Sequence, residues 1–278
     1  MWPDINLPPI NLWNLPNYLN LKDGEIMKIL IAGYGFVGKA HALALEGKGV
    51  TTHVYDPAKG YDEFPRDIDA AIICVSTPQA KDGRCDMSNV YDVVARIPND
   101  IPILIKSTIS IDGWRLLQRQ DPRANNITFS PEFLRADHAL EDFKNQKVIY
   151  IGGGQLHFWV NLLSNRLNTV IELCEPEELI LAKYFRNSFL ATKVAFFNQI
   201  YDLCERLNIE YSAVAHYVTE DPRIGDSHSF ITEERGFGGH CFPKDTSAIV
   251  SDAMGYGVYL SIIDEAIKYN NALRKKDD

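Results

Sequence analysis

The chain has 278 residues, of which 46% are hydrophobic and 23% are charged, a composition typical of a globular protein with room for two domains. Its formal net charge of −9 argues against nucleic acid as the main partner, although it allows a local basic pocket. No stretch approaches the ~20 apolar residues of a membrane span, so we expect no membrane partner. The five cysteines form no CxxC pair and no metal spacing with His, which predicts reduced thiols, no metal site and a cytoplasmic protein.

Residues 1–26 differ in composition from the rest of the chain and are interpreted as an N-terminal extension. They are rich in Pro, Asn, Leu and Trp, and they lack the basic start and apolar core of a secretory signal. Their spaced apolar residues favour packing against a surface. Beyond this extension, the residue patterns divide the chain into a dinucleotide-binding domain over 27–174 and a helical catalytic and dimerisation domain over 175–278.

A glycine-rich loop opens the first of these domains. Residues 28–32 form a short apolar run typical of a buried parallel strand, and a helix-like segment begins at Lys39. In that context a GxGxxG motif predicts a loop that holds a pyrophosphate at a helix N-terminus. The loop residues are Gly33, Gly35, Phe36, Val37 and Gly38.

A second strand ends at Asp56, whose carboxylate is spaced to accept hydrogen bonds from the ribose hydroxyls of a dinucleotide. Because a carboxylate repels a 2′-phosphate, NAD is favoured over NADP, although the nearby Lys59 weakens that preference. Four further apolar segments (70–75, 103–106, 127–129 and 147–151) alternate with helix-like segments, which predicts a doubly wound parallel sheet. Thr77 with Pro78, Thr108 and Glu132 come after three of them, so we expect these residues at the glycine-loop edge.

The pattern changes to helix after residue 175. Residues 177–206 contain no Pro or Gly and predict one long central helix of ~45 Å. Lys183 and Asn187 lie four residues apart, so they share one face of it. Aromatic residues on both sides indicate a helix buried on most faces, where a lysine needs a partner or a ligand.

The most distinctive segment is 236–245, with the sequence GFGGHCFPKD. Pro243 suits the first turn of a helix, which places Cys241 at a helix N-terminus with Lys244 nearby, and both features favour a thiolate. A nicotinamide cofactor implies hydride transfer, and a Lys–Asn pair can stabilise an oxyanion. A thiolate can carry an aldehyde through a thiohemiacetal to a thioester, which a carboxylate can help hydrolyse. The residues alone therefore suggest oxidation of a primary alcohol to an acid with two NAD.

These motifs resemble those of the nucleotide-sugar 6-dehydrogenases, the UDP-glucose and GDP-mannose dehydrogenases, from about Met27 to about Asn271. The most specific matches are residues 236–245 and the SPEFLR segment at 130–135. The resemblance implies NAD-dependent, four-electron oxidation of the C6 alcohol of a nucleotide sugar, with UDP-glucose the expected substrate. It also implies a homodimer built on the long helix at 175–207.

The resemblance further implies a role for individual residues. Cys241 would be the nucleophile, Lys183 and Asn187 would stabilise the oxyanion, and Glu132 would serve hydrolysis with a water ordered by Thr108 and Asp245. Thr108 and Lys244 would also contact the cofactor. Substrate contacts would come from Phe133, Leu134, Arg135, Gly238 and, across the dimer, Arg223.

The chain departs from the family pattern in two ways. Ala136 stands where the family usually has a second Glu after the Phe-Leu-Arg segment, which puts one cofactor or hydrolysis contact in question. Family members also usually continue into a second α/β domain that closes over the nucleotide, whereas this chain ends where that domain would begin, so we expect weak or relaxed recognition of the nucleotide, or a smaller substrate. Two alternatives stay open: a two-electron β-hydroxyacid-type dehydrogenase, which also carries Lys and Asn on a long helix, and a non-catalytic protein that binds NAD or a nucleotide sugar.

Overall fold

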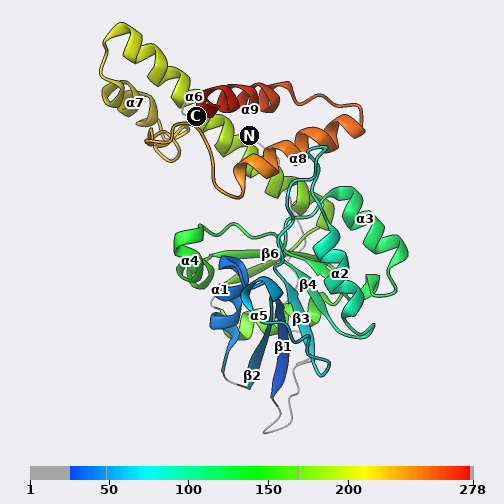
Figure 1. The fold of residues 1–278 in the computed structure, drawn as a ribbon. Helices are drawn as coiled ribbons and strands as arrows, with labels where there is room; N and C mark the ends of the chain where they lie inside the picture. Colours follow the sequence, from blue (N-terminus) through cyan, green and yellow to red (C-terminus); the bar gives the residue numbers. More distant parts are fainter. Residues whose placement is uncertain (1–25, 48, 168, 276–278) are drawn as a thin grey trace.

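The computed structural model describes residues 26–275 except Lys48 and Asn168 (Figure 1). The predicted N-terminal extension therefore lies outside the described residues except for Ile26. Among the helices of the described ranges, none combines the length and apolar character needed to cross a lipid bilayer.

A seven-stranded sheet forms the first part of the fold, in the order β2-β1-β3-β4-β5-β6-β7 (Figure 1). Its strands are β1 (Met27–Ala32), β2 (Val50–Tyr55), β3 (Ala70–Ile73), β4 (Ile103–Ile105), β5 (Ile127–Phe129), β6 (Val148–Gly153) and β7 (Val170–Leu173). The connecting helices are α1 (Phe36–Leu45), α2 (Ser88–Arg96), α3 (Ile111–Gln120), α4 (Ala139–Asn145) and α5 (Leu156–Arg166), with short 3-10 turns at Pro57–Lys59, Ala124–Asn126 and Ala136–His138.

Two apolar cores cover the two faces of this sheet, as expected for a doubly wound fold. Side chains alternate along a strand, so Ile29 and Ile31 of β1 face one core and Leu30 faces the other. The first core also contains residues of α1, α4 and α5, and the second contains residues of α2, α3 and the start of the long helix. The predicted α/β class is therefore confirmed.

The prediction of a fully parallel sheet is wrong at one position. Strands β1 to β5 are parallel, but β6 pairs with β5 in the antiparallel sense, through Thr128 opposite Gly153 and Phe129 opposite Gly152. The helix between them, α4, has seven residues and packs against α1. Residues 130–147 connect the two strands, which is long enough for a parallel crossover, so the length of the connection does not set the direction of β6. Instead the chain re-enters the sheet from the edge at which β5 ends. Strand β7 was not predicted, and it pairs parallel to β6.

The long helix α6 (Pro176–Leu207) confirms the predicted central helix and joins the sheet to the helical part of the molecule (Figure 1). There it is accompanied by α7 (Tyr211–Thr219), α8 (Phe242–Gly255) and α9 (Ser261–Arg274). Helices α8 and α9 both pack on α6, which seats the N-terminus of α8 above the sheet.

Two buried asparagines fix the chain that leads into α8. Asn198 of α6 accepts hydrogen bonds from Gly236 N (3.1 Å) and from Arg235 Nε (2.8 Å). Asn270 of α9 accepts from Phe237 N at 2.6 Å and donates to Phe237 O at 3.0 Å. Since burying such backbone groups without partners would be costly, these side chains specify the path of the cysteine segment.

Candidate active site

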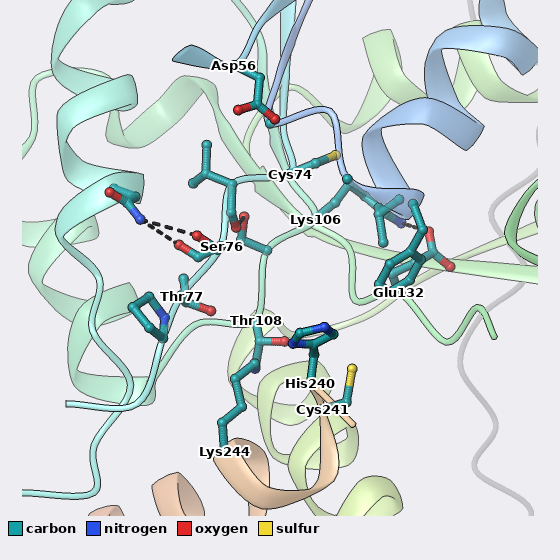
Figure 2. Close-up of a pocket in the computed structure, with 18 of the residues that line it drawn as sticks. Asp56, Cys74, Ser76, Thr77, Lys106, Thr108, Glu132, His240, Cys241 and Lys244 are labelled. Carbon is teal, nitrogen blue, oxygen red and sulfur yellow. Dashed lines mark hydrogen bonds and ion pairs between the residues drawn. The ribbon is translucent and has the colours of Figure 1, made fainter. Parts of the chain in front are cut away.

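A cavity of about 920 Å³ lies where the parallel strands end and α8 begins. The glycine loop and Asp56 line one end, and Cys241 and Lys244 line the other, with Thr77 and Thr108 between them (Figure 2). Ligands of doubly wound sheets bind at this edge. The geometry therefore joins the two motifs that the sequence singled out.

The glycine loop has the shape that a pyrophosphate needs. Gly33 adopts a φ of +88°, and a Cβ there would lie 2.6 Å from the backbone of Cys74. A Cβ on Gly38 would lie 1.9 Å from Gly33 O, whereas one on Gly35 would meet no atom of the described residues within 4 Å. Gly33 and Gly38 thus allow close packing of the loop on its neighbours, and Gly35 leaves space beside the N-terminus of α1.

Two charged residues in the turn that follows β2 support this loop. Asp56 Oδ2 accepts a hydrogen bond from Tyr34 N at 2.7 Å, and Lys59 Nζ donates to Tyr34 O. Both residues also line the cavity. The other predicted cofactor contacts that line it are Phe36, Val37, Thr77, Pro78, Thr108 and Lys244, whereas Gly38 packs behind the loop.

At the opposite end, Lys183 of α6 lines the cavity together with Cys241, the predicted nucleophile. Its Nζ donates to the backbone oxygen of Glu132 at 2.6 Å. Burial lowers the pKa of Lys183, and the nearby Asp245 carboxylate and Cys241 thiol partly oppose that shift. Cys241 itself is the N-cap residue of α8, with Pro243 in the first turn as predicted.

A buried amide–carboxylate pair lies directly behind this end of the cavity. Asn187 Nδ2 donates to Asp245 Oδ2 at 2.6 Å, and Lys244 Nζ forms an ion pair with Oδ1 of the same carboxylate. Asn187 and Asp245 are both buried, and neither lines the cavity. In this structure the pair holds α6 against the first turn of α8, so it fixes Lys183 relative to Cys241.

Glu132 is buried beside two residues that the sequence reasoning missed. Its Oε2 lies 3.1 Å from Lys106 Nζ and 3.7 Å from His41 Nε2. Burial raises the pKa of Glu132, but Lys106 and a hydrogen bond from Phe133 N outweigh burial, and the net pKa is lowered. Burial is also the main cause that lowers the pKa of His41, to about 4, so its imidazole is neutral near pH 7.

The signals for these missed residues were weak. Lys106 directly follows the apolar run of β4, and His41 interrupts the apolar face of α1. His240, which also lines the cavity, stands within the cysteine segment itself (Figure 2).

Several predicted substrate residues lie away from the cavity. Of the three at 133–135, only Leu134 lines it. Phe133 lies under the Arg186 guanidinium at 4.3 Å, and Arg135 forms an ion pair with Asp142. Arg223 pairs with Asp221, and its side chain is 87% exposed.

Gly238 likewise does not line the cavity, and a Cβ there would lie 2.3 Å from the Arg274 guanidinium. Ala136 opens the 3-10 turn after the segment and is exposed.

Models of known protein families match both parts of the chain that form this site. The NAD-binding domain of the UDP-glucose/GDP-mannose dehydrogenase family matches residues 51–162, and the central domain of the same family matches residues 178–272. The chain belongs to this family. The NAD-binding match and the glycine loop together make NAD its cofactor.

Among the named members of the family, the UDP-glucose 6-dehydrogenase of Rickettsia typhi is 33% identical over 224 residues, which cover 76% of this chain and 51% of that protein. The UDP-glucose 6-dehydrogenase YwqF of Bacillus subtilis is 31% identical over 231 residues, covering 76% of this chain and 50% of YwqF. The chain therefore spans about half the length of the curated relatives it matches.

Solved structures share the fold of this chain. A UDP-glucose dehydrogenase from Pyrobaculum islandicum superposes with a TM-score of 0.75 at 27% identity, covering 89% of this chain and 68% of that chain. A 3-hydroxyisobutyrate dehydrogenase from Mycobacterium tuberculosis shares the fold at a TM-score of 0.65 and 17% identity, covering 88% of this chain and 92% of that chain.

Proposed function

We propose that this chain carries out the NAD-dependent, four-electron oxidation of the C6 alcohol of a nucleotide sugar, with UDP-glucose as the substrate. The observation that carries the proposal is one cavity with a dinucleotide loop at one end and Cys241 beside Lys183 at the other. UDP-glucose is favoured because the Rickettsia typhi and Bacillus subtilis relatives are named as UDP-glucose 6-dehydrogenases.

The cofactor fits the cavity on the evidence of the loop alone. The open space at Gly35 suits a pyrophosphate at the N-terminus of α1, and Asp56 suits a ribose. When bound there, NAD accepts a hydride from the substrate carbon. Thr77, Thr108 and Lys244 line the path from the loop to Cys241, so they would hold the nicotinamide half.

The residues around Cys241 would then divide the chemistry. Lys183 stabilises the alkoxide as the first hydride leaves C6, because its ammonium reaches the Cys241 end of the cavity. Cys241 Sγ forms a bond to the aldehyde carbon, and the oxygen takes up a proton to give a thiohemiacetal. Loss of a second hydride and of that proton leaves a thioester on Cys241.

Hydrolysis returns the enzyme to its starting state. Glu132 accepts a proton from water, whose oxygen attacks the thioester carbon. The C–S bond breaks, and the proton passes to Cys241 Sγ. Atoms balance as one alcohol, two NAD and one water giving one acid, two NADH and two protons. Asn187 and Asp245 would act from behind the cavity by holding α6 and α8 in register.

A homodimer built on α6 is part of the proposal. Four large apolar residues repeat along one exposed side of this helix, where they favour contact with a partner: Phe185, Phe189, Phe196 and Leu203. Arg223 lies beyond the cavity of its own chain and would reach the partner's sugar. The free thiols of all five cysteines fit a reducing compartment, which supports action in the cytoplasm.

A two-electron β-hydroxyacid dehydrogenase is the second candidate, because the Mycobacterium tuberculosis enzyme shares this fold over nearly its whole length. That chemistry does not use a thiol, so a cysteine facing the cavity counts against it. A non-catalytic binding protein is disfavoured because Cys241, Lys183 and Glu132 all surround one cavity.

The test is NADH formation with a panel of UDP-glucose, GDP-mannose and 3-hydroxyisobutyrate. We expect turnover with UDP-glucose and none with the hydroxyacid. Turnover with the hydroxyacid alone would replace the proposal with the second candidate. NAD binding without turnover of any member of the panel would favour the non-catalytic alternative.

A further inference from the structure

Lys106 is buried at the carboxyl end of β4, and its side chain is 2% exposed. One ammonium group contacts three successive residues there. Its Nζ lies 3.1 Å from Glu132 Oε2, donates to Ser130 Oγ at 2.8 Å and donates to Pro131 O at 3.4 Å. Lys106 therefore holds both the carboxylate of Glu132 and the backbone that precedes it.

The same short segment also carries the contact to α6. Lys183 donates to the backbone oxygen of Glu132, not to its carboxylate. Lys106 and Lys183 thus contact Glu132 through different atoms. A shift of residues 130–132 would move both the Glu132 carboxylate and the backbone oxygen that Lys183 contacts.

Among the described residues, Lys183 also interacts electrostatically with Glu132, although its ammonium contacts the backbone oxygen, whereas two other titratable groups beside the carboxylate are uncharged near pH 7. His41 Nδ1 lies 2.9 Å from Val37 O and therefore carries the ring proton, so Nε2 faces Glu132 without one. Burial lowers the pKa of this imidazole to about 4, and burial raises the pKa of Cys74, which directly follows β3, to about 12. Within the described part of the chain, Lys106 is the cation that contacts the carboxylate directly.

We propose that Lys106 is a positioning residue for the hydrolysis step, which keeps Glu132 ionised and fixes its carboxylate against the cavity. A buried carboxylate without a cation favours its protonated form, and a protonated Glu132 cannot accept a proton from water. The part of this inference that concerns hydrolysis rests on the proposed function. The part that concerns the charge of Glu132 stands on the geometry alone.

The experiment compares Lys106→Met, which keeps the length of the side chain but removes its charge, with Lys106→Arg, which keeps the charge. The matched control is Lys193→Met, because Lys193 donates to the backbone oxygens of Ile224 and Gly225 and contacts no carboxylate among the described residues. Enzyme is mixed with NAD and UDP-glucose and quenched in acid, and the acyl group on Cys241 is measured by intact mass.

In Lys106→Met we expect the NADH burst to persist while the thioester accumulates and hydrolysis slows at least ~10-fold. The acid limb of turnover should move up by at least ~1 pH unit, since full burial can shift a carboxyl pKa by several units. Lys106→Arg should restore most of both properties. Unchanged hydrolysis and an unchanged acid limb in Lys106→Met would overturn the proposal, and so would equal shifts in Lys193→Met.

An infrared titration without substrate separates this inference from the proposed function. The signal to follow is the infrared band of protonated Glu132, which is assigned by its absence when Glu132 is replaced by Gln. At pH 6 this band should be absent in the wild type, where Glu132 is ionised, and present in Lys106→Met. If the band appears in Lys106→Met but the wild type oxidises no nucleotide sugar, the proposed function is refuted and the charge assignment of Glu132 is supported. If two NADH form per sugar but Lys106→Met shows no such band, the proposed function is supported and the charge assignment of Glu132 is refuted.

If Lys106→Met fails to fold, the double variant Lys106→Met/Glu132→Gln tests whether the unpaired charge of Glu132 is the cause. It leaves no unpaired charge, so we expect it to fold and to unfold at a temperature close to that of the wild type. Failure of the double variant as well would assign the defect to lost packing and overturn the proposal.

Discussion

Acid should destabilise this protein through one buried histidine, His41. Its Nδ1 donates to Val37 O at 2.9 Å, its ring lies 4.1 Å from that of Phe143, and the side chain is almost fully buried. The imidazole is therefore neutral in the folded state, whereas in the unfolded chain it can take up a proton.

The loss of folding stability in acid depends on the pKa of His41, which burial lowers from 6.5 to about 4. Between these values the unfolded chain binds the proton and the folded protein does not. The stability contributed by neutral His41 is thus complete above pH 6.5 and lost as the pH falls towards 4. At ~1.4 kcal/mol per pKa unit, the loss amounts to about 3 kcal/mol, most of it above pH 4.5.

The assay is urea unfolding between pH 7.5 and 4.5, for the wild type and for His41→Asn. Asparagine can still donate to Val37 O but does not titrate. We expect the variant to be less stable at pH 7.5 but to lose about 3 kcal/mol less on acidification. Asp252 acts in the opposite sense, because burial raises its pKa to about 6, and the difference between wild type and variant removes that contribution.

Exposed His138→Asn controls for the loss of one imidazole. If His41→Asn and the wild type lost stability in parallel across this range, the assignment of a buried neutral imidazole would be refuted.

Three further substitutions test other parts of the site and the proposed dimer. Gly38→Ala places a Cβ 1.9 Å from Gly33 O, so we expect a lower melting temperature and loss of NAD binding by calorimetry. The Cβ of Gly35→Ala meets no atom of the described residues within 4 Å, so this variant should keep the melting temperature while weakening NAD binding at least ~10-fold; unchanged affinity would contradict a pyrophosphate at this position. Phe189 is 69% exposed on α6, and Phe189→Glu should convert a dimer to a monomer in light scattering, whereas Leu43→Glu on α1 should not; a wild-type monomer would end the dimer proposal.

The sequence was informative where a motif lies within one short segment. The glycine loop, the strand that ends at Asp56 and the helix start at Pro243 each depend on neighbouring residues, and local backbone rules are enough to predict them. The long helix was equally accessible, because no Pro or Gly interrupts it.

Features that depend on distant segments could not be predicted in this way. The Lys106–Glu132 pair joins β4 to the loop after β5, and His41 reaches it from α1. The antiparallel pairing of β6 with β5 depends on where the chain re-enters the sheet after α4, which packs on α1. Asn187 was predicted as part of the oxyanion site from its spacing to Lys183, but the structure pairs its amide with Asp245 behind the cavity. Tertiary packing decides each of these arrangements.

The most direct test of the proposed mechanism is the number of NADH formed per molecule of UDP-glucose, for the wild type beside Cys241→Ser. A limiting amount of sugar is converted to completion with excess NAD, and NADH is read by absorbance. We expect two NADH per sugar for the wild type. The serine variant should form no thioester and should not complete the second oxidation at the wild-type rate. One NADH per sugar, or a serine variant as active as the wild type, would contradict the thioester mechanism.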